Sequence, residues 1–159
     1  MFKIISTALV LFSLAVGATA APRDCLRPAE IEAERAIRFQ TELMVVNETC
    51  HEQIYPRFLH RNRKALVDYQ KRMIDRYRRA GAARPTASLD TFMTGLANQI
   101  SLQAGAQPVD ELCREHADFL AAADALDAKT FRRYIAKEAA GSDADDRRCE
   151  SDSLAKDRD

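Results

Sequence analysis

Apolar side chains recur at helical spacing along most of the chain, most clearly between residues 55 and 81. Pro56 suits a first helical turn, and Gly81 followed by Pro85 ends the pattern. The buried stripe of this predicted helix comprises Tyr55, Phe58, Leu59, Asn62, Leu66, Tyr69, Met73 and Tyr77. The spacing therefore predicts one long amphipathic helix in this region.

Four further helices are predicted on either side of it. The first begins at Pro28 and ends near Cys50, with Glu30, Glu32 and Glu34 favouring the positive end of its dipole. Ser88 is the expected N-cap of the next one, which Gly105 ends. The last two begin at Pro108 and Asp127. Val109, Leu112, Cys113, His116, Phe119, Leu120 and Ala123 share one side of the first of these, and Phe131, Tyr134 and Ile135 are the buried residues of the second.

No alternating strand pattern or internal repeat is present in the sequence. Ala, Leu, Arg and Glu are abundant and Gly is scarce, which favours helices over sheets. We therefore predict an all-α, four- to five-helix up-down bundle spanning residues 21–140. Residues 141–159 are almost wholly charged or small and are expected to form a mobile tail.

The first 20 residues have the pattern of a cleaved signal peptide. A basic start at Lys3 precedes an apolar run from Ile4 to Val16, and Ala18-Thr19-Ala20 places small residues where signal peptidase cuts. The run is shorter than the roughly 20 residues that a membrane span needs. We expect a mature protein that starts near Ala21, has no transmembrane anchor, and is periplasmic or secreted from a bacterium.

Export would place the four cysteines where disulfides form and persist. Four cysteines allow three connectivities. A helix over residues 28–49 separates Cys25 from Cys50 by about 30 Å, far beyond the reach of a disulfide. Antiparallel neighbouring helices bring Cys50 and Cys113 to the same end of the bundle. We therefore predict Cys50–Cys113 together with Cys25–Cys149.

A metal site or a thiol-redox site is the alternative use of the same residues. Cys113 and His116 lie on one helical face, and Cys50 and His51 can meet them at one end of the bundle; this donor set suits zinc or copper. Adjacent residues rarely bind one tetrahedral ion, and export favours oxidised thiols. The disulfide interpretation is therefore preferred, with no metal and no cofactor.

Positive charge is concentrated on the long helix. Ten Lys or Arg residues lie between Arg57 and Arg84, against only Asp68 and Asp75. The residues opposite the apolar stripe form a candidate anion-binding surface: Arg57, Arg61, Lys64, Lys71, Arg78 and Arg79. Its expected partner is an anionic envelope polymer, an acidic lipid headgroup or an acidic envelope protein; export disfavours nucleic acid. A solvated face, on which Asp68 and Asp75 pair with cations four residues away, is the simpler reading.

Some of these segments resemble a known group of proteins. Cys25-Leu26-Arg27-Pro28, Thr41-Glu42-Leu43-Met44-Val45 ahead of Cys50, and the later Cys113 resemble small exported helical proteins of alphaproteobacteria that have no assigned function. The resemblance covers roughly residues 25–120. It implies export, helices and a cysteine framework, and it carries no catalytic or ligand-binding residues.

The sequence lacks a phosphate-binding glycine loop, a nucleophile elbow and a His-Glu-x-x-His pattern. We therefore expect a non-enzymatic binding or accessory protein. The alternative is a periplasmic metal-binding or thiol-redox protein that uses Cys50, Cys113 and His116.

Overall fold

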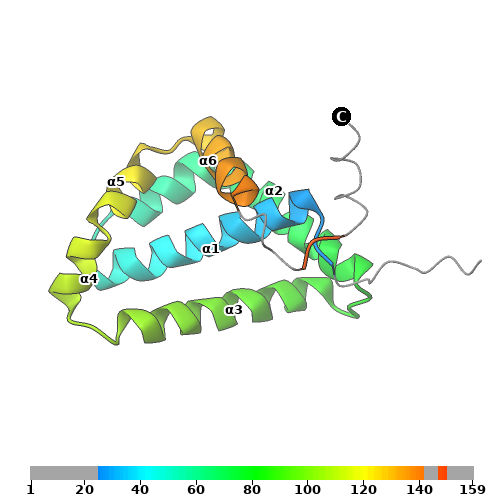
Figure 1. Ribbon diagram of the computed structural model, residues 1–159, viewed down its shortest axis with the longest axis horizontal. Coiled ribbons are helices and arrows are strands. Elements are labelled where there is room, and N and C mark those ends of the chain that lie inside the picture. The colour runs from blue at the N-terminus through cyan, green and yellow to red at the C-terminus, as the bar shows by residue number, and fades with distance from the viewer. Residues whose placement is uncertain (1–24, 142–146, 150–159) are drawn as a thin grey trace, which may run out of the picture.

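The computed structural model describes residues 25–141 and 147–149, and within them the protein is all-α (Figure 1). The described residues form six helices: α1 (Pro28–Thr49), α2 (Ile54–Arg79), α3 (Pro85–Ala104), α4 (Val109–Glu115), α5 (Ala117–Ala125) and α6 (Ala128–Ala140). The predicted fold class is confirmed, with one helix more than expected. No helix within the described ranges is both long and apolar enough to cross a lipid bilayer.

Helix α1 lies at the centre of the bundle and contacts each of the other five helices (Figure 1). This position explains why its apolar pattern is less one-sided than that of α2. Ile31, Ile37, Leu43 and Val46 are all buried, and so are the polar Gln40 and Asn47. Because neighbours surround α1, no single face of it is left to be uniformly polar.

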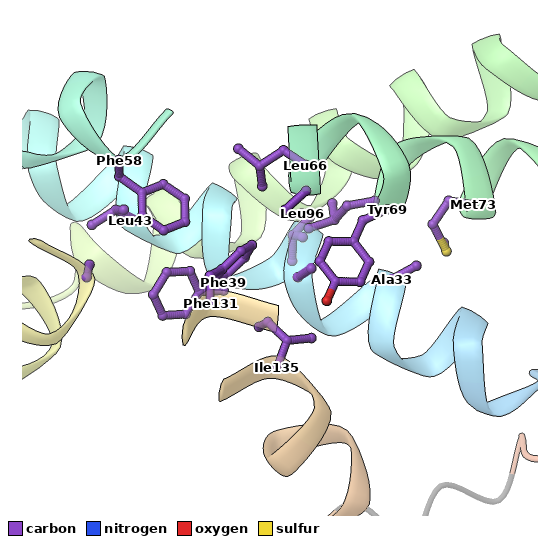
Figure 2. Packing of buried hydrophobic residues seen from close by; sticks show 14 of the residues in the cluster. Ala33, Phe39, Leu43, Phe58, Leu66, Tyr69, Met73, Leu96, Phe131 and Ile135 are labelled. Carbon is purple, nitrogen blue, oxygen red and sulfur yellow. The ribbon is translucent and has the colours of Figure 1, made fainter. Parts of the chain in front are cut away.

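An aromatic cluster joins α1, α2 and α6 in the core (Figure 2). The ring of Phe131 lies 5.0 Å from that of Phe58 and 5.5 Å from that of Phe39, measured between centroids. Tyr69 completes the cluster with its ring edge-on to Phe131. Such tilted and edge-on pairs add about 0.5–1.5 kcal/mol each to the burial of the rings. The cluster fixes α6 against the first two helices.

Helix α2 begins two residues earlier than Pro56, and its start is held by a side chain of α1. The Asn47 Oδ1 atom accepts hydrogen bonds from the backbone N–H groups of Ile54 and Tyr55, both at 2.9 Å. The predicted end at Gly81 is correct, since Gly81 has a φ of 89° and Ala82 N–H donates to Tyr77 O. This is the left-handed glycine turn that commonly ends a helix.

Helix α3 begins at Pro85, so the prediction that Ser88 caps it is wrong. Proline has no N–H to leave unpaired and its φ is already helical, so it starts the helix without a side-chain cap. The Ser88 hydroxyl instead donates to Arg84 O, one turn back, at 3.2 Å. The extra turn lengthens α3 alongside α1.

The helix predicted to begin at Pro108 is broken at His116 into α4 and α5. His116 has a φ of −96° and a ψ of 8°, and its Nδ1 atom lies 2.9 Å from Leu112 O. The break bends the chain so that α5 can pack against both α1 and α2. Asp127 caps α6 as predicted, because its Oδ1 accepts from the backbone N–H groups of Lys129 and Thr130.

Part of the predicted C-terminal tail pairs with the start of the bundle. Leu26 N–H donates to Arg147 O at 2.6 Å, and Cys149 N–H donates to Leu26 O at 3.1 Å. The guanidinium of Arg147 also contacts the buried Glu34 carboxylate at 3.2 Å. The remainder of the tail, and the predicted signal peptide at residues 1–20, lie outside the described residues.

Candidate functional site

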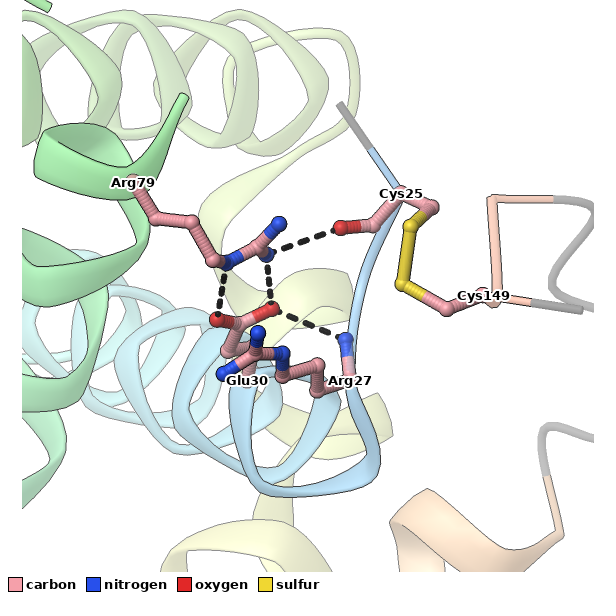
Figure 3. Close-up of a disulfide and its surroundings, with 5 residues drawn as sticks. All are labelled: Cys25, Arg27, Glu30, Arg79 and Cys149. Carbon is pink, nitrogen blue, oxygen red and sulfur yellow. Dashed lines mark hydrogen bonds and ion pairs between the residues drawn. A yellow bond between two sulfur atoms is a disulfide. The ribbon is translucent and has the colours of Figure 1, made fainter. Parts of the chain in front are cut away.

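Two disulfides brace opposite ends of α1, and Figure 3 shows the one between Cys25 and Cys149. Cys50 and Cys113 are bonded with their Cα atoms 5.6 Å apart, and Cys25 and Cys149 with theirs 4.9 Å apart. The predicted pairing is confirmed. Disulfides of this kind are typical of proteins that reside outside the reducing cytoplasm.

The residues of the alternative metal site do not form a donor set. The sulfur atoms of Cys50 and Cys113 are joined to each other, so neither is present as a thiolate that could bind an ion. His51 is exposed, and His116 contacts Leu112 O and faces Glu42. Within residues 25–141 and 147–149, no group of three His, Cys, Asp or Glu side chains is arranged to hold a metal ion.

Some cations of the candidate anion-binding surface on α2 form ion pairs within the molecule, and others do not. At the start of the helix, Arg57 and Arg61 both contact Asp124 of α5, at 3.1 and 3.3 Å. Hydrogen bonds from Arg57 hold the pKa of the Asp124 carboxyl below its ordinary value. These two arginines already have an acidic partner within the molecule.

At the other end of α2, Arg78 pairs with Asp75 and Arg79 pairs with Glu30. The Glu30 Oε2 atom lies 2.6 Å from Arg79 Nη2, which also donates to Cys25 O at 3.0 Å (Figure 3). Only 7% of Glu30 is exposed. Arg79 therefore neutralises a buried carboxylate beside the Cys25–Cys149 disulfide, and it is structural rather than ligand-binding.

The middle of α2 has cations without acidic partners. The predicted pairs of Lys64 and Lys71 with Asp68 and Asp75 do not form, because Asp68 pairs with Arg132 of α6 and Asp75 with Arg78. Lys64 and Lys71 are exposed, and among the described residues they have no ion-pair partner. Both nearby aspartates thus pair with arginines, and the ammonium groups of the two lysines face solvent.

A hollow of about 330 Å³ lies along the same part of α2. We call it the α2 hollow; its lining residues are Gln40, Leu59, His60, Arg63, Leu66, Val67 and Gln70. All but Gln40 come from α2. Val67 is 55% exposed, so it presents apolar surface to solvent at the hollow. Arg63 is exposed and, like the two lysines, has no ion-pair partner among the described residues.

Gln40 is the polar side chain that α1 contributes to the hollow. It is only 8% exposed, and its Oε1 atom is buried without a hydrogen-bond partner. The amide Nε2 donates to the Tyr55 hydroxyl at 3.4 Å, a long contact. A buried polar atom without a partner costs about 1–3 kcal/mol, so a bound molecule that satisfies this amide would gain from the contact.

Sequence reasoning found Lys64 and Lys71 but missed the rest of this site. His60, Lys64, Val67 and Lys71 follow one another at steps of four, three and four residues, which places them on one face of a helix. Arg63 lies three residues after His60 and four before Val67, so it borders the same face. The signal in the sequence is Val67, an apolar residue among basic ones on a face predicted to be polar. Gln40 gives no such signal, because only the packing of α1 on α2 brings it to the hollow.

No protein-family model matches the chain, and neither curated proteins nor solved structures give a match. The site is therefore interpreted from its own geometry.

Proposed function

We propose that the protein is an exported, non-enzymatic accessory protein of the cell envelope that binds acidic lipid headgroups through the α2 hollow. The observation that carries this proposal is that one face of α2 combines an exposed valine with cations that have no ion-pair partner among the described residues. Arg63 lines the hollow, Lys64 and Lys71 lie on the same side of α2, and Val67 supplies the exposed apolar surface.

The chemistry of the site suits an anionic amphiphile better than a purely ionic ligand. Guanidinium and ammonium groups near an acidic membrane surface contribute about 1 kcal/mol each. The arginine can also bind a phosphate through two parallel hydrogen bonds. An apolar lining adds the burial of methylene groups, at about 0.8 kcal/mol for each. A soluble polyanion would gain only the attraction to the positively charged groups and would leave the Val67 side chain exposed to water.

Two features support the export part of the proposal. Residues 1–20 carry a basic start, an apolar run and a small-residue cleavage pattern. Both disulfides are formed, and disulfides persist in oxidising compartments such as the bacterial periplasm. An exported protein in that compartment meets acidic phospholipid surfaces.

Binding to vesicles tests the proposed ligand. The purified, disulfide-bonded protein is mixed with vesicles of phosphatidylcholine alone, or of phosphatidylcholine and phosphatidylglycerol in equal parts. We expect sedimentation with the acidic vesicles only, weakened by salt. Arg63→Glu with Lys64→Glu should abolish it. The matched control, Arg133→Glu with Lys137→Glu, makes the same charge change on exposed positions of α6 and should retain binding. Equal binding to both vesicle types, or equal loss in both variants, would overturn the proposal.

A second pair of variants tests the apolar contribution. Val67→Asp places a carboxylate in the hollow, whereas Leu102→Asp makes the same change at a 77% exposed leucine on α3. Neither side chain belongs to the core, so both variants should fold. We expect only Val67→Asp to release the protein from acidic vesicles. Retention of both variants would show that the hollow itself takes no part in binding.

A further inference from the structure

A second concavity lies between α1, α3 and α4, near the Cys50–Cys113 disulfide. We call it the α1–α3 groove; it has a volume of about 310 Å³. Its apolar lining includes Val46, Leu96 and Leu112, each no more than 5% exposed. Arg38, Glu42 and His116 also line it. The groove therefore combines a positively charged and a negatively charged side chain with a buried apolar lining.

The two charged groups on α1 are not paired with each other. Arg38 and Glu42 are one turn apart, a spacing at which opposite charges often form a pair. Arg38 Nη2 instead lies 3.2 Å from Glu34 Oε1, and Glu42 Oε1 lies 3.8 Å from His116 Nε2. The groove therefore presents a cation that Glu34 engages on one side and an anion that has only the His116 ring beside it among the described residues.

The contact between Glu42 and His116 lacks a proton donor when the imidazole is neutral. His116 Nδ1 lies 2.9 Å from Leu112 O, and since a carbonyl only accepts, Nδ1 carries the hydrogen. The Nε2 atom is then an acceptor facing a carboxylate, which also only accepts. A ligand ammonium group has three donors and can donate to both atoms at once.

At the Arg38 position the site favours a carboxylate. The guanidinium has five donors, and the contact with Glu34 leaves some of them available, with the ring of Phe92 5.8 Å away. One helical turn places the Cβ atoms of Arg38 and Glu42 about 5–6 Å apart. A peptide advances about 3.3–3.6 Å per residue, so a dipeptide of up to about 7 Å is long enough to reach from one of these residues to the other.

Glutamine side chains extend the polar edge of the groove. Gln99 and Gln103 lie one turn apart on α3, and Gln107 follows the helix. An amide side chain both donates and accepts, which is the pairing that a peptide backbone requires. We propose that the α1–α3 groove binds a short peptide with free termini and an apolar side chain, with its ammonium at Glu42 and His116 and its carboxylate at Arg38.

Titration with one dipeptide and its two blocked forms tests this proposal. The probes are alanyl-leucine, N-acetyl-alanyl-leucine and alanyl-leucine amide, followed by amide chemical shifts of the disulfide-bonded protein. We expect saturable shifts at the groove for alanyl-leucine, and at least about 10-fold weaker binding for each blocked form, because each loses one charge-assisted contact. The absence of saturation at millimolar alanyl-leucine would overturn the proposal.

Variants assign each end of the peptide. Glu42→Gln should weaken binding of alanyl-leucine about 10-fold and leave binding of the N-acetyl form unaffected. Arg38→Gln should also weaken binding of alanyl-leucine about 10-fold, but it should leave binding of alanyl-leucine amide unaffected. Glu34 keeps Arg147 as a partner in the Arg38 variant, and Glu42 is 43% exposed, so both proteins should fold. Arg63→Gln, in the α2 hollow, is the control. If Arg63→Gln weakens dipeptide binding as much as Glu42→Gln does, the dipeptide does not bind in the α1–α3 groove as proposed. Binding to acidic vesicles should be unchanged in the Glu42→Gln and Arg38→Gln variants. This readout separates the peptide proposal from the lipid proposal.

Discussion

The ends of α2 and its middle carry similar basic side chains but differ in what those side chains contact. At the ends, Arg57 and Arg61 contact Asp124, and Arg79 contacts Glu30. In the middle, Arg72 pairs with Glu32 of α1, whereas Lys64 and Lys71 face solvent and Arg63 lines the α2 hollow. The comparison teaches that the number of charges on a helix does not give its ligand-binding surface, because tertiary contacts decide which charges remain available.

The largest effect is expected at the C-terminal end of α2. Arg79→Met leaves the Glu30 carboxylate buried without its cation, and loss of one partner of a buried pair is strongly destabilising. We expect the free energy of unfolding to fall by about 3 kcal/mol in urea titrations of the disulfide-bonded protein. Arg78→Met, which breaks an exposed pair with Asp75, should cost less than about 1 kcal/mol. Equal losses would show that the Arg79 contact has no structural role.

A smaller effect is expected at the N-terminal end, where Asn47 holds the first turn. Asn47→Ala removes an acceptor from two backbone N–H groups and should lower the free energy of unfolding by about 1–2 kcal/mol. Ser88→Ala, at the residue that sequence reasoning chose as a cap, should change it by less than about 0.5 kcal/mol. Thermal or urea unfolding of the two variants measures both values. A larger loss at Ser88 would contradict the observed start of α3.

Releasing the paired arginines should make the N-terminal end of α2 resemble its middle. Asp124→Asn removes the negative charge that neutralises Arg57 and Arg61, while Arg61 keeps its hydrogen bond to the backbone carbonyl of residue 124, so the positive charge of both arginines becomes available to an acidic surface. We expect binding to phosphatidylglycerol vesicles to become tighter by up to about 10-fold. The control is Asp118→Asn, an exposed position on α5 with the same change in net charge. If both variants bind equally well, net charge rather than release of the arginines explains the gain.

The smallest effect is on the acid titration of two exposed carboxyls. Hydrogen bonds from Arg57 lower the pKa of Asp124, and those from the Thr130 backbone and side chain lower the pKa of Asp127. Each folded-state pKa lies below the unfolded value, so the stabilisation is present above the unfolded pKa and is lost as the pH falls through the folded one. Carboxyl NMR titration of Arg57→Gln with Arg61→Gln should return the pKa of Asp124 to its ordinary value and leave Asp127 low. An unchanged pKa at Asp124 would contradict the role of the arginines.

Local sequence patterns predicted the helices and the disulfides well because these depend on periodicity and helix length. The length of α1, at 1.5 Å per residue, is enough to exclude a Cys25–Cys50 disulfide. Gly81 ends α2 and Asp127 caps α6, as their backbone and side-chain chemistry predicts. Ser88 does not cap α3 because the helix already begins at Pro85. The helix predicted from Pro108 is broken at His116, which lets α5 pack against α1 and α2.

The candidate site was less predictable because its charges depend on residues far apart in the sequence. The pairing of Asp68 with Arg132, and of Arg61 with Asp124, joins positions 64 and 63 residues apart. Spacing along α2 favours local pairs and cannot reveal these contacts. Gln40 reaches the α2 hollow only through the packing of α1, so nothing in its own neighbourhood marks it as part of a site.

The most direct test compares two variants of α2 that lose the same charge. One replaces three cations in the middle and the other three at the ends: Arg63→Gln, Lys64→Gln and Lys71→Gln against Arg57→Gln, Arg61→Gln and Arg78→Gln. The dissociation constant for phosphatidylglycerol vesicles is measured for both at the same low salt concentration. We predict a loss of about 100-fold for the middle variant, at about 1 kcal/mol per cation, and little change for the end variant. Equal losses in the two variants would contradict the account.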